Sequence, residues 1–167
     1  DGAWMGLARA GGPCVAAATG VPAGHLTARL GSQRMTLVGL GIMAGGALAL
    51  SLASALVPYL AALMLLTLGY SLFQAANNTA VMSDVDASRR GTISGLLNLS
   101  RNLGLIFGAS ALGAVFAWAS PDVTRATAQT VANGLHVTFA VALALILAAS
   151  TFAWRRHSAE NSAQNIR

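Results

Sequence analysis

Charged side chains are scarce in this sequence of 167 residues. Only 9% of its residues are charged, lysine is absent, and five acidic residues stand against ten arginines, whereas 55% of the residues are hydrophobic. A globular domain in water carries about 25% charged residues, so this chain cannot cover a soluble surface. The shortage of charge also excludes a disordered segment and a coiled coil. A nucleic-acid-binding arm is excluded because the scattered arginines form no basic stripe. The surroundings of most of the chain are therefore predicted to be a lipid bilayer.

Cysteine and the common catalytic motifs are also missing or nearly so. Cys14 is the only cysteine, so neither a disulfide nor a thiolate metal site can be built within the chain. The sequence has no P-loop, no His-Glu-x-x-His pair and no glycine-rich nucleotide fingerprint. Direct ATP use and zinc-dependent hydrolysis therefore have no support, and we expect no cofactor.

Long uncharged runs are what the sequence has instead. A membrane-spanning helix needs about 20 apolar residues. The runs accommodate five such helices, at approximately 3–23, 35–56, 59–82, 88–118 and 134–154. Pro58 marks a tight turn between the second and the third. The predicted fold is an all-α, polytopic transmembrane bundle over residues 1–154, followed by a polar tail at 155–167.

The arginines predict the orientation of the bundle. Positive residues near the ends of spans stay on the cytoplasmic side. With the N-terminus outside, the inner segments hold seven arginines and the outer loops hold only Arg125. We expect a multi-pass protein of the cell's inner (plasma) membrane with a cytoplasmic C-terminus. Because the first span starts almost at residue 1 with no initiator methionine, we also expect the C-terminal portion of a longer protein.

Glycine pairs four residues apart indicate where helices could meet. Such a pair lies on one helix face and lets a neighbouring backbone approach closely. The pairs are Gly20 and Gly24, Gly41 and Gly45, Gly91 and Gly95, and Gly104 and Gly108. We expect these faces to be packing faces.

Polar side chains are unevenly distributed among the five predicted spans. The second and fifth carry nothing more polar than Ser and Thr in their interiors, so these two can face lipid. The third carries Tyr70, Gln74, Asn77 and Asn78, and the fourth carries Ser94, Asn98, Arg101 and Asn102. Both sets have the i, i+4, i+7, i+8 spacing of a single helical stripe. We therefore predict a substrate cavity lined by Tyr70, Gln74, Asn77, Asn98, Arg101 and Asn102.

Arg101 is the most costly of these residues to place in a membrane. A central arginine costs about 2.5–3.5 kcal/mol on insertion scales, and Arg101 lies on the order of 15 Å inside the start of its helix. One interpretation is a cavity cation that attracts an anionic group or adjusts a nearby carboxylate. The other is a clamp onto backbone carbonyls or onto an absent helix. For Gln74, Asn77 and Asn98, interhelical hydrogen bonding alone is the alternative to ligand contact.

Two segments resemble a known family. Residues 24–34, Gly-His-Leu-Thr-Ala-Arg-Leu-Gly-Ser-Gln-Arg, resemble the loop motif G-x-L-a-D-R-x-G-x-R of the major facilitator superfamily, although Ala28 stands at the usual Asp position. Residues 69–113 resemble a helix, inner loop and helix of bacterial drug:proton antiporters. That likeness is carried by Gly-Tyr-Ser-Leu-Phe-Gln-Ala-Ala-Asn-Asn, then Arg-Arg-Gly-Thr-Ile-Ser-Gly and Asn-Leu-Ser-Arg-Asn-Leu-Gly.

The resemblance implies a secondary transporter and not an enzyme. The five spans would be the last five helices of the second six-helix repeat, with the third and fourth bordering a central cavity and the second and fifth peripheral. Such carriers work by rocking one half against the other. The resemblance further implies efflux of drugs or amphipathic organic molecules coupled to protons. The expected partners are the bilayer, a small-molecule substrate, protons and a missing N-terminal half, but no nucleic acid.

Charged residues cluster at the predicted inner mouth. Two of the predicted connections carry opposite charges that can pair and latch this mouth. The predicted cytoplasmic gate consists of Gly24, Arg29, Gly31, Arg34, Asp84, Asp86, Arg89 and Arg90. The alternative is a set of solvated topology determinants, with Asp86 or Ser88 capping the next helix.

A group that could carry a coupled proton is not evident. All five acids lie at chain ends or in predicted loops, so we expect the coupling acid in the absent part. His136, near the outer start of the fifth span, is interpreted as an interfacial polar residue. Two alternatives to a carrier remain open: an intramembrane serine hydrolase using Ser110 and His136, and a non-transporting anchor or pore subunit.

Overall fold

The fold is entirely helical in the part of the chain that the structure describes. The computed structural model describes residue 27 and residues 29–120 and 128–164, with side chains at 27, 29–120 and 129–155. Its helices are α2 (Ser32–Leu52), α3 (Leu56–Met82), α4 (Arg90–Ala119) and α5 (Ala128–Gln164). Each is long and apolar enough to cross a membrane. The predicted all-α transmembrane bundle is thereby confirmed, while the first predicted span, at 3–23, lies outside the described residues.

The helix ends follow from local chemistry. A connection at 53–55 joins α2 to α3, and Pro58 lies in the first turn of α3, where its missing N–H leaves no helical acceptor unpaired. The N–H of Arg89 donates to the carbonyl oxygen of Asp86 (2.9 Å) just before α4 begins. No side chain caps α4, so the capping role considered for Asp86 or Ser88 was wrong. At its other end α5 continues as helix to Gln164, into the predicted polar tail.

Glycines allow α2 and α3 to pack with their backbones in contact. A Cβ placed on Gly39 would lie 2.6 Å from the backbone nitrogen of Phe73. A Cβ on Gly69 would lie 2.6 Å from the backbone nitrogen of Met43. An added Cβ would lie this close to the backbone of the other helix only because no side chain separates the two helices. Small residues permit this close approach of helices in membranes. The α2–α3 pair is therefore the most closely packed part of the described bundle.

The expected glycine pairs were wrong for the described residues. A Cβ on Gly41 or Gly45 would meet no atom within 4 Å, and the same is true at Gly91, Gly95, Gly104 and Gly108. The first pair, Gly20 and Gly24, lies outside the described residues. On α2 the contacting glycines are instead Gly39 and Gly46, which are seven residues and hence about two turns apart.

Helix α2 lies against both α3 and α5 and contains most of the buried side chains. Met35, Ala47 and Leu50 are fully or almost fully buried, whereas Val38 and Leu48 on another side are exposed. The expectation that this helix faces lipid therefore fits only one of its sides. Its few hydroxyl groups do bond back to their own helix as expected, since the Thr36 hydroxyl donates to the carbonyl oxygen of Ser32 (2.8 Å).

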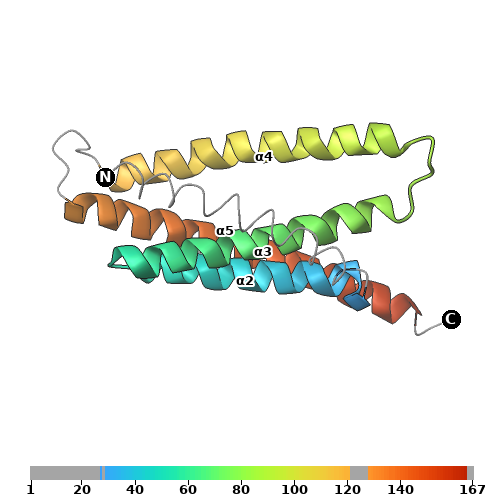
Figure 1. Ribbon diagram of the computed structural model, residues 1–167, viewed down its shortest axis with the longest axis horizontal. Coiled ribbons are helices and arrows are strands. Elements are labelled where there is room, and N and C mark those ends of the chain that lie inside the picture. The colour runs from blue at the N-terminus through green and yellow to red at the C-terminus, as the bar shows by residue number, and fades with distance from the viewer. Residues whose placement is uncertain (1–26, 28, 121–127, 165–167) are drawn as a thin grey trace.

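Helix α4 runs apart from the other three for most of its length (Figure 1). It meets α5 at its C-terminal end, where the Ser120 hydroxyl donates to the carbonyl oxygen of Thr130 (3.2 Å) and Phe116 packs at Gly134. None of its residues is buried within the described structure, and Trp118 is 80% exposed. The approach of α4 to α3 is limited to a few points, so the space between these two helices can hold a cavity.

Candidate functional site

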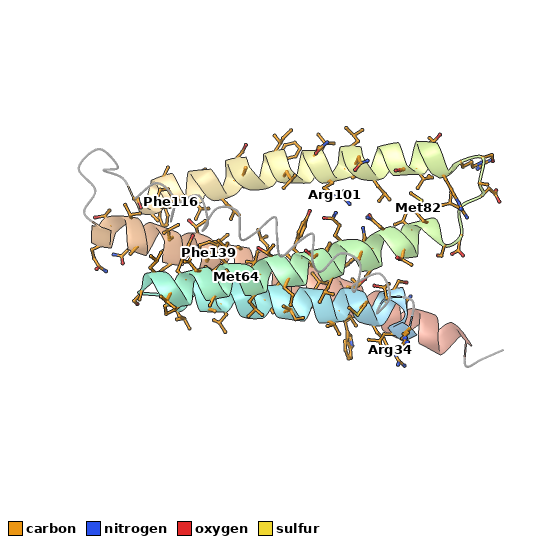
Figure 2. The ribbon with its side chains drawn as sticks, viewed as in Figure 1. Arg34, Met64, Met82, Arg101, Phe116 and Phe139 are labelled. Carbon is orange, nitrogen blue, oxygen red and sulfur yellow. The ribbon has the colours of Figure 1, made fainter. Side chains whose placement is uncertain are left out.

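A partly open cavity with a volume of about 240 Å³ lies between the described parts of α3 and α4, and its lining is mainly apolar with several polar groups. From α3 it is lined by Tyr70, Phe73, Gln74 and Asn77. From α4 it is lined by Leu97, Ser100 and Arg101. Figure 2 shows Arg101 on the side of α4 that faces α3. The polar stripe of α3 thus faces α4, whereas on α4 only Arg101 of the polar stripe lines the cavity. Ser94, Asn98 and Asn102 are exposed.

The guanidinium of Arg101 bridges the two helices. Its Nη2 donates to Oδ1 of Asn78 on α3 (3.2 Å), and its Nη1 donates to Oδ1 of Asn98 one turn away on α4 (3.3 Å). Among the described residues, its acceptors are therefore side-chain amides and not the backbone carbonyls of the clamp interpretation. Arg101 lies eleven residues after Arg90, the first residue of α4. At the rise of an α-helix, Arg101 is therefore about 16 Å from the start of α4.

The structure brings together most of the residues predicted to line the cavity. Tyr70, Gln74, Asn77 and Arg101 line it, and Asn98 reaches it through its bond to Arg101. Asn102 does not belong to this group, because its side chain is exposed and is not among the described lining residues.

Three lining residues of the cavity and one hydrogen-bond partner of Arg101 were not among the predicted site residues. Asn78, which accepts from Arg101, belongs to the polar stripe of α3, so periodicity alone could have included it. Phe73, Leu97 and Ser100 line the cavity as well. Phe73 and Leu97 are apolar, so a search for polar residues in the spans could not find them. Their place in the cavity can be recognised only once it is known which sides of α3 and α4 face each other.

The predicted gate residues are exposed and unpaired with one another in this conformation. Gly24 lies outside the described residues. No ion pair joins the exposed side chains of Arg29, Arg34, Asp84, Asp86, Arg89 and Arg90 within the described structure. The Arg90 side chain instead donates through Nε to the carbonyl oxygen of Val85 (3.3 Å). The latch stays a prediction.

Gly31 has a specific structural role at this end of the bundle. It precedes the first residue of α2 with φ of 83°, a left-handed backbone conformation that side chains with a Cβ rarely adopt. The Met35 N–H donates to its carbonyl oxygen (3.2 Å). A glycine is therefore required here for the chain to turn into α2.

His136 lies near the N-terminal end of α5 and connects this helix to the turn between α2 and α3. Its Nε2–H donates to the carbonyl oxygen of Ala53 (3.1 Å), because a carbonyl can only accept. Nearby, the rings of Tyr59 and Phe139 meet edge to face, with centroids 6.4 Å apart. Ser110 is exposed on α4 and makes no hydrogen bond to His136 in the described structure, so the hydrolase interpretation has no support.

These features define a multi-pass membrane protein with a solute-sized cavity of mixed polarity between two of its helices. The family model of the Major Facilitator Superfamily matches residues 3–109, so the chain belongs to this superfamily. The protein is accordingly a membrane transporter, with the bilayer and a small-molecule substrate as its partners, and not an enzyme in the usual sense. Comparison with curated proteins and with solved structures finds no match.

Proposed function

We propose that this chain is the C-terminal part of a proton-coupled efflux permease that exports small amphipathic organic molecules by alternating access. The observation that carries the proposal is the cavity between α3 and α4, with Arg101 held between amide oxygens of the two helices. Ionisable residues inside a membrane protein characteristically mark substrate or ion pathways. The missing N-terminal half would supply the other wall of this cavity.

The lining of the cavity supports an amphipathic substrate. Phe73 and Leu97 offer apolar surface, while Tyr70, Gln74 and Asn77 offer hydroxyl and amide groups. Binding sites for small organic molecules combine mostly apolar walls with a few polar groups that fix orientation. A purely hydrophilic solute would leave the aromatic and aliphatic side chains without a partner.

Proton coupling requires a titratable group within the membrane, and this chain places no acidic residue in a predicted span. Its five acids occupy chain ends or the segments outside the predicted spans, and Asp84 and Asp86 are exposed between α3 and α4. We therefore assign the coupling carboxylate to the N-terminal part. The support for proton coupling is the likeness of residues 69–113 to drug:proton antiporters.

The arginine distribution supports a cytoplasmic location of the C-terminus in the inner membrane. The segments 29–34 and 83–90 would then form the cytoplasmic mouth. Their opposite charges are separate in this conformation, and we propose that they pair when the mouth closes. Exposed ion pairs are worth less than about 1 kcal/mol each, which suits a latch that must open in every cycle.

Reversing the charge of Arg29 tests this latch. We expect Arg29→Asp in the full-length carrier to reduce efflux, because an acid at this position repels Asp84 and Asp86 instead of pairing with them. The measurement is the rate of dye efflux from cells at equal protein abundance. Unchanged efflux would reject the latch, and Arg155→Asp, at an exposed position on α5, serves as the matched control.

The transport function itself is tested with the full-length protein in proteoliposomes. A panel of cationic, neutral and anionic amphipathic dyes is loaded, and a pH gradient is imposed. We expect gradient-dependent movement of at least one dye that a protonophore abolishes. Gln74→Leu should raise the KM for that dye, whereas Gln129→Leu, at an exposed position outside the cavity, should not. A panel in which no dye moves would contradict the proposal.

A further inference from the structure

Arg101 gives the cavity a positive charge that no described residue balances. A guanidinium carries its charge throughout the physiological pH range. Its two acceptors, Asn78 and Asn98, are neutral amides. The two acids with described side chains, Asp84 and Asp86, are exposed in the connection before α4 and form no ion pair in the described structure. An unbalanced positive charge inside a membrane protein favours the binding of an anion beside it.

The hydrogen-bonding groups of Arg101 point to the same ligand chemistry. An arginine has five N–H donors arranged as a planar fork, and the two asparagines accept from Nη1 and Nη2 only. The remaining donors have no acceptor among the described residues. Two parallel N–H groups match the two oxygens of a carboxylate in a bidentate pair. A planar carboxylate would therefore satisfy donors that are costly to leave unpaired in a membrane interior.

The rest of the cavity determines what the carboxylate is attached to. Phe73 and Leu97 provide apolar surface beside Arg101, and Tyr70 provides an aromatic ring with a hydroxyl group. The volume of about 240 Å³ accommodates a small ring system. We infer that the cavity binds a small aromatic or aliphatic monocarboxylate, with its carboxylate on Arg101 and its apolar part against Phe73 and Leu97. This inference rests on the proposed transport function and specifies the class of substrate.

Equilibrium binding to the purified full-length carrier tests the inference. The carrier is placed in phosphatidylcholine nanodiscs, and radiolabelled benzoate, indole-3-acetate and 1-naphthoate are each compared with the corresponding amide, which has the same shape without the charge. We expect at least one acid to bind about tenfold to a hundredfold more tightly than its amide, the effect of a hydrogen-bonded charge. Arg101→Gln should abolish this preference. Arg155→Gln, the same exchange at an exposed position of α5, should preserve it.

A second variant covers the case in which Arg101→Gln does not fold. Arg101→Lys retains the positive charge and loses the planar fork, so the preference for the acid should persist but shrink. Equal binding of every acid and its amide to the unmodified carrier would overturn the inference, as would an undiminished preference in Arg101→Gln. Displacement of the bound acid by phosphatidylglycerol added to the nanodiscs would assign the site to a lipid phosphate and would overturn it as well.

The outcomes for this inference and for the transport proposal are distinct. Selective binding of a carboxylate without movement of any dye in proteoliposomes would reject transport and leave the binding site standing. Dye movement without any preference for carboxylates would retain transport and reject the anion site.

Discussion

Replacing Gly69 with alanine is expected to reduce sharply the amount of folded carrier in the membrane. The added Cβ would lie 2.6 Å from the backbone nitrogen of Met43 and 2.9 Å from the carbonyl oxygen of Gly39. Backbone atoms cannot move aside as a flexible side chain can, so α2 and α3 would have to separate. Overpacking costs about 1–3 kcal/mol or more, which exceeds the gain of about 1 kcal/mol in helix propensity from replacing glycine. The measurement is protein abundance and thermal stability after detergent extraction.

The matched control for this substitution lies on α2. A Cβ on Gly41 or Gly45 would meet nothing within 4 Å, so Gly41→Ala and Gly45→Ala should leave abundance unchanged or raise it slightly. Gly46→Ala should behave like Gly69→Ala, because its Cβ would lie 2.6 Å from the backbone nitrogen of Leu66. Similar stability of the Gly69 and Gly41 variants would show that these helices do not pack as described.

Replacing Asn78 with aspartate is expected to stabilise the carrier and to slow transport. The substitution changes almost no volume and places a carboxylate where an amide oxygen now lies 3.2 Å from Nη2 of Arg101. The guanidinium would gain a permanent counter-charge that bridges α3 and α4, and a transported anion would have to compete with it. We expect transport of an anionic substrate to fall about tenfold, equivalent to about 1.4 kcal/mol. Thermal stability should rise by about 2–4 °C for each kcal/mol gained.

A double variant identifies the cause of this effect. In Asn78→Asp combined with Arg101→Gln, the new carboxylate has no guanidinium beside it, so the stability gained in the single variant should disappear. Additive effects of the two substitutions would mean that residues 78 and 101 do not interact. The bridge between α3 and α4 would then be rejected.

Much of this architecture follows from hydropathy and polarity. Uncharged runs long enough to span a bilayer predicted the helices that became α2 to α5. The turn between α2 and α3 falls at 53–55, a few residues before the predicted position at Pro58, because proline is accommodated in the first turn of α3. The cost of amides and a guanidinium in lipid predicted that the polar sides of α3 and α4 would border a shared cavity, and the structure places Tyr70, Gln74 and Asn77 of α3 and Arg101 of α4 around one. The hydrogen bond between Arg101 and Asn78 joins the two helices.

What sequence reasoning missed was the direction in which each helix face points. The spacing of Gly41 and Gly45 fits a packing motif as well as any other pair, but the neighbouring helix lies on the side of Gly39 and Gly46. Likewise Asn102 shares a stripe with Arg101, yet α4 is rotated so that Leu97 and Ser100 line the cavity. The rotation of α4 about its axis is decided by tertiary packing, and the spacing of its polar residues did not reveal it.

The short connection at 53–55 has a consequence for biogenesis. Helices α2 and α3 follow each other almost without interruption, and their glycine contacts require no residue from α4 or α5. This hairpin can therefore enter the bilayer and assemble as a unit during synthesis, before the ribosome has completed the later helices. Helix α4 buries no side chain within the described structure and meets α5 at its C-terminal end, so this contact can form only after α5 has been made.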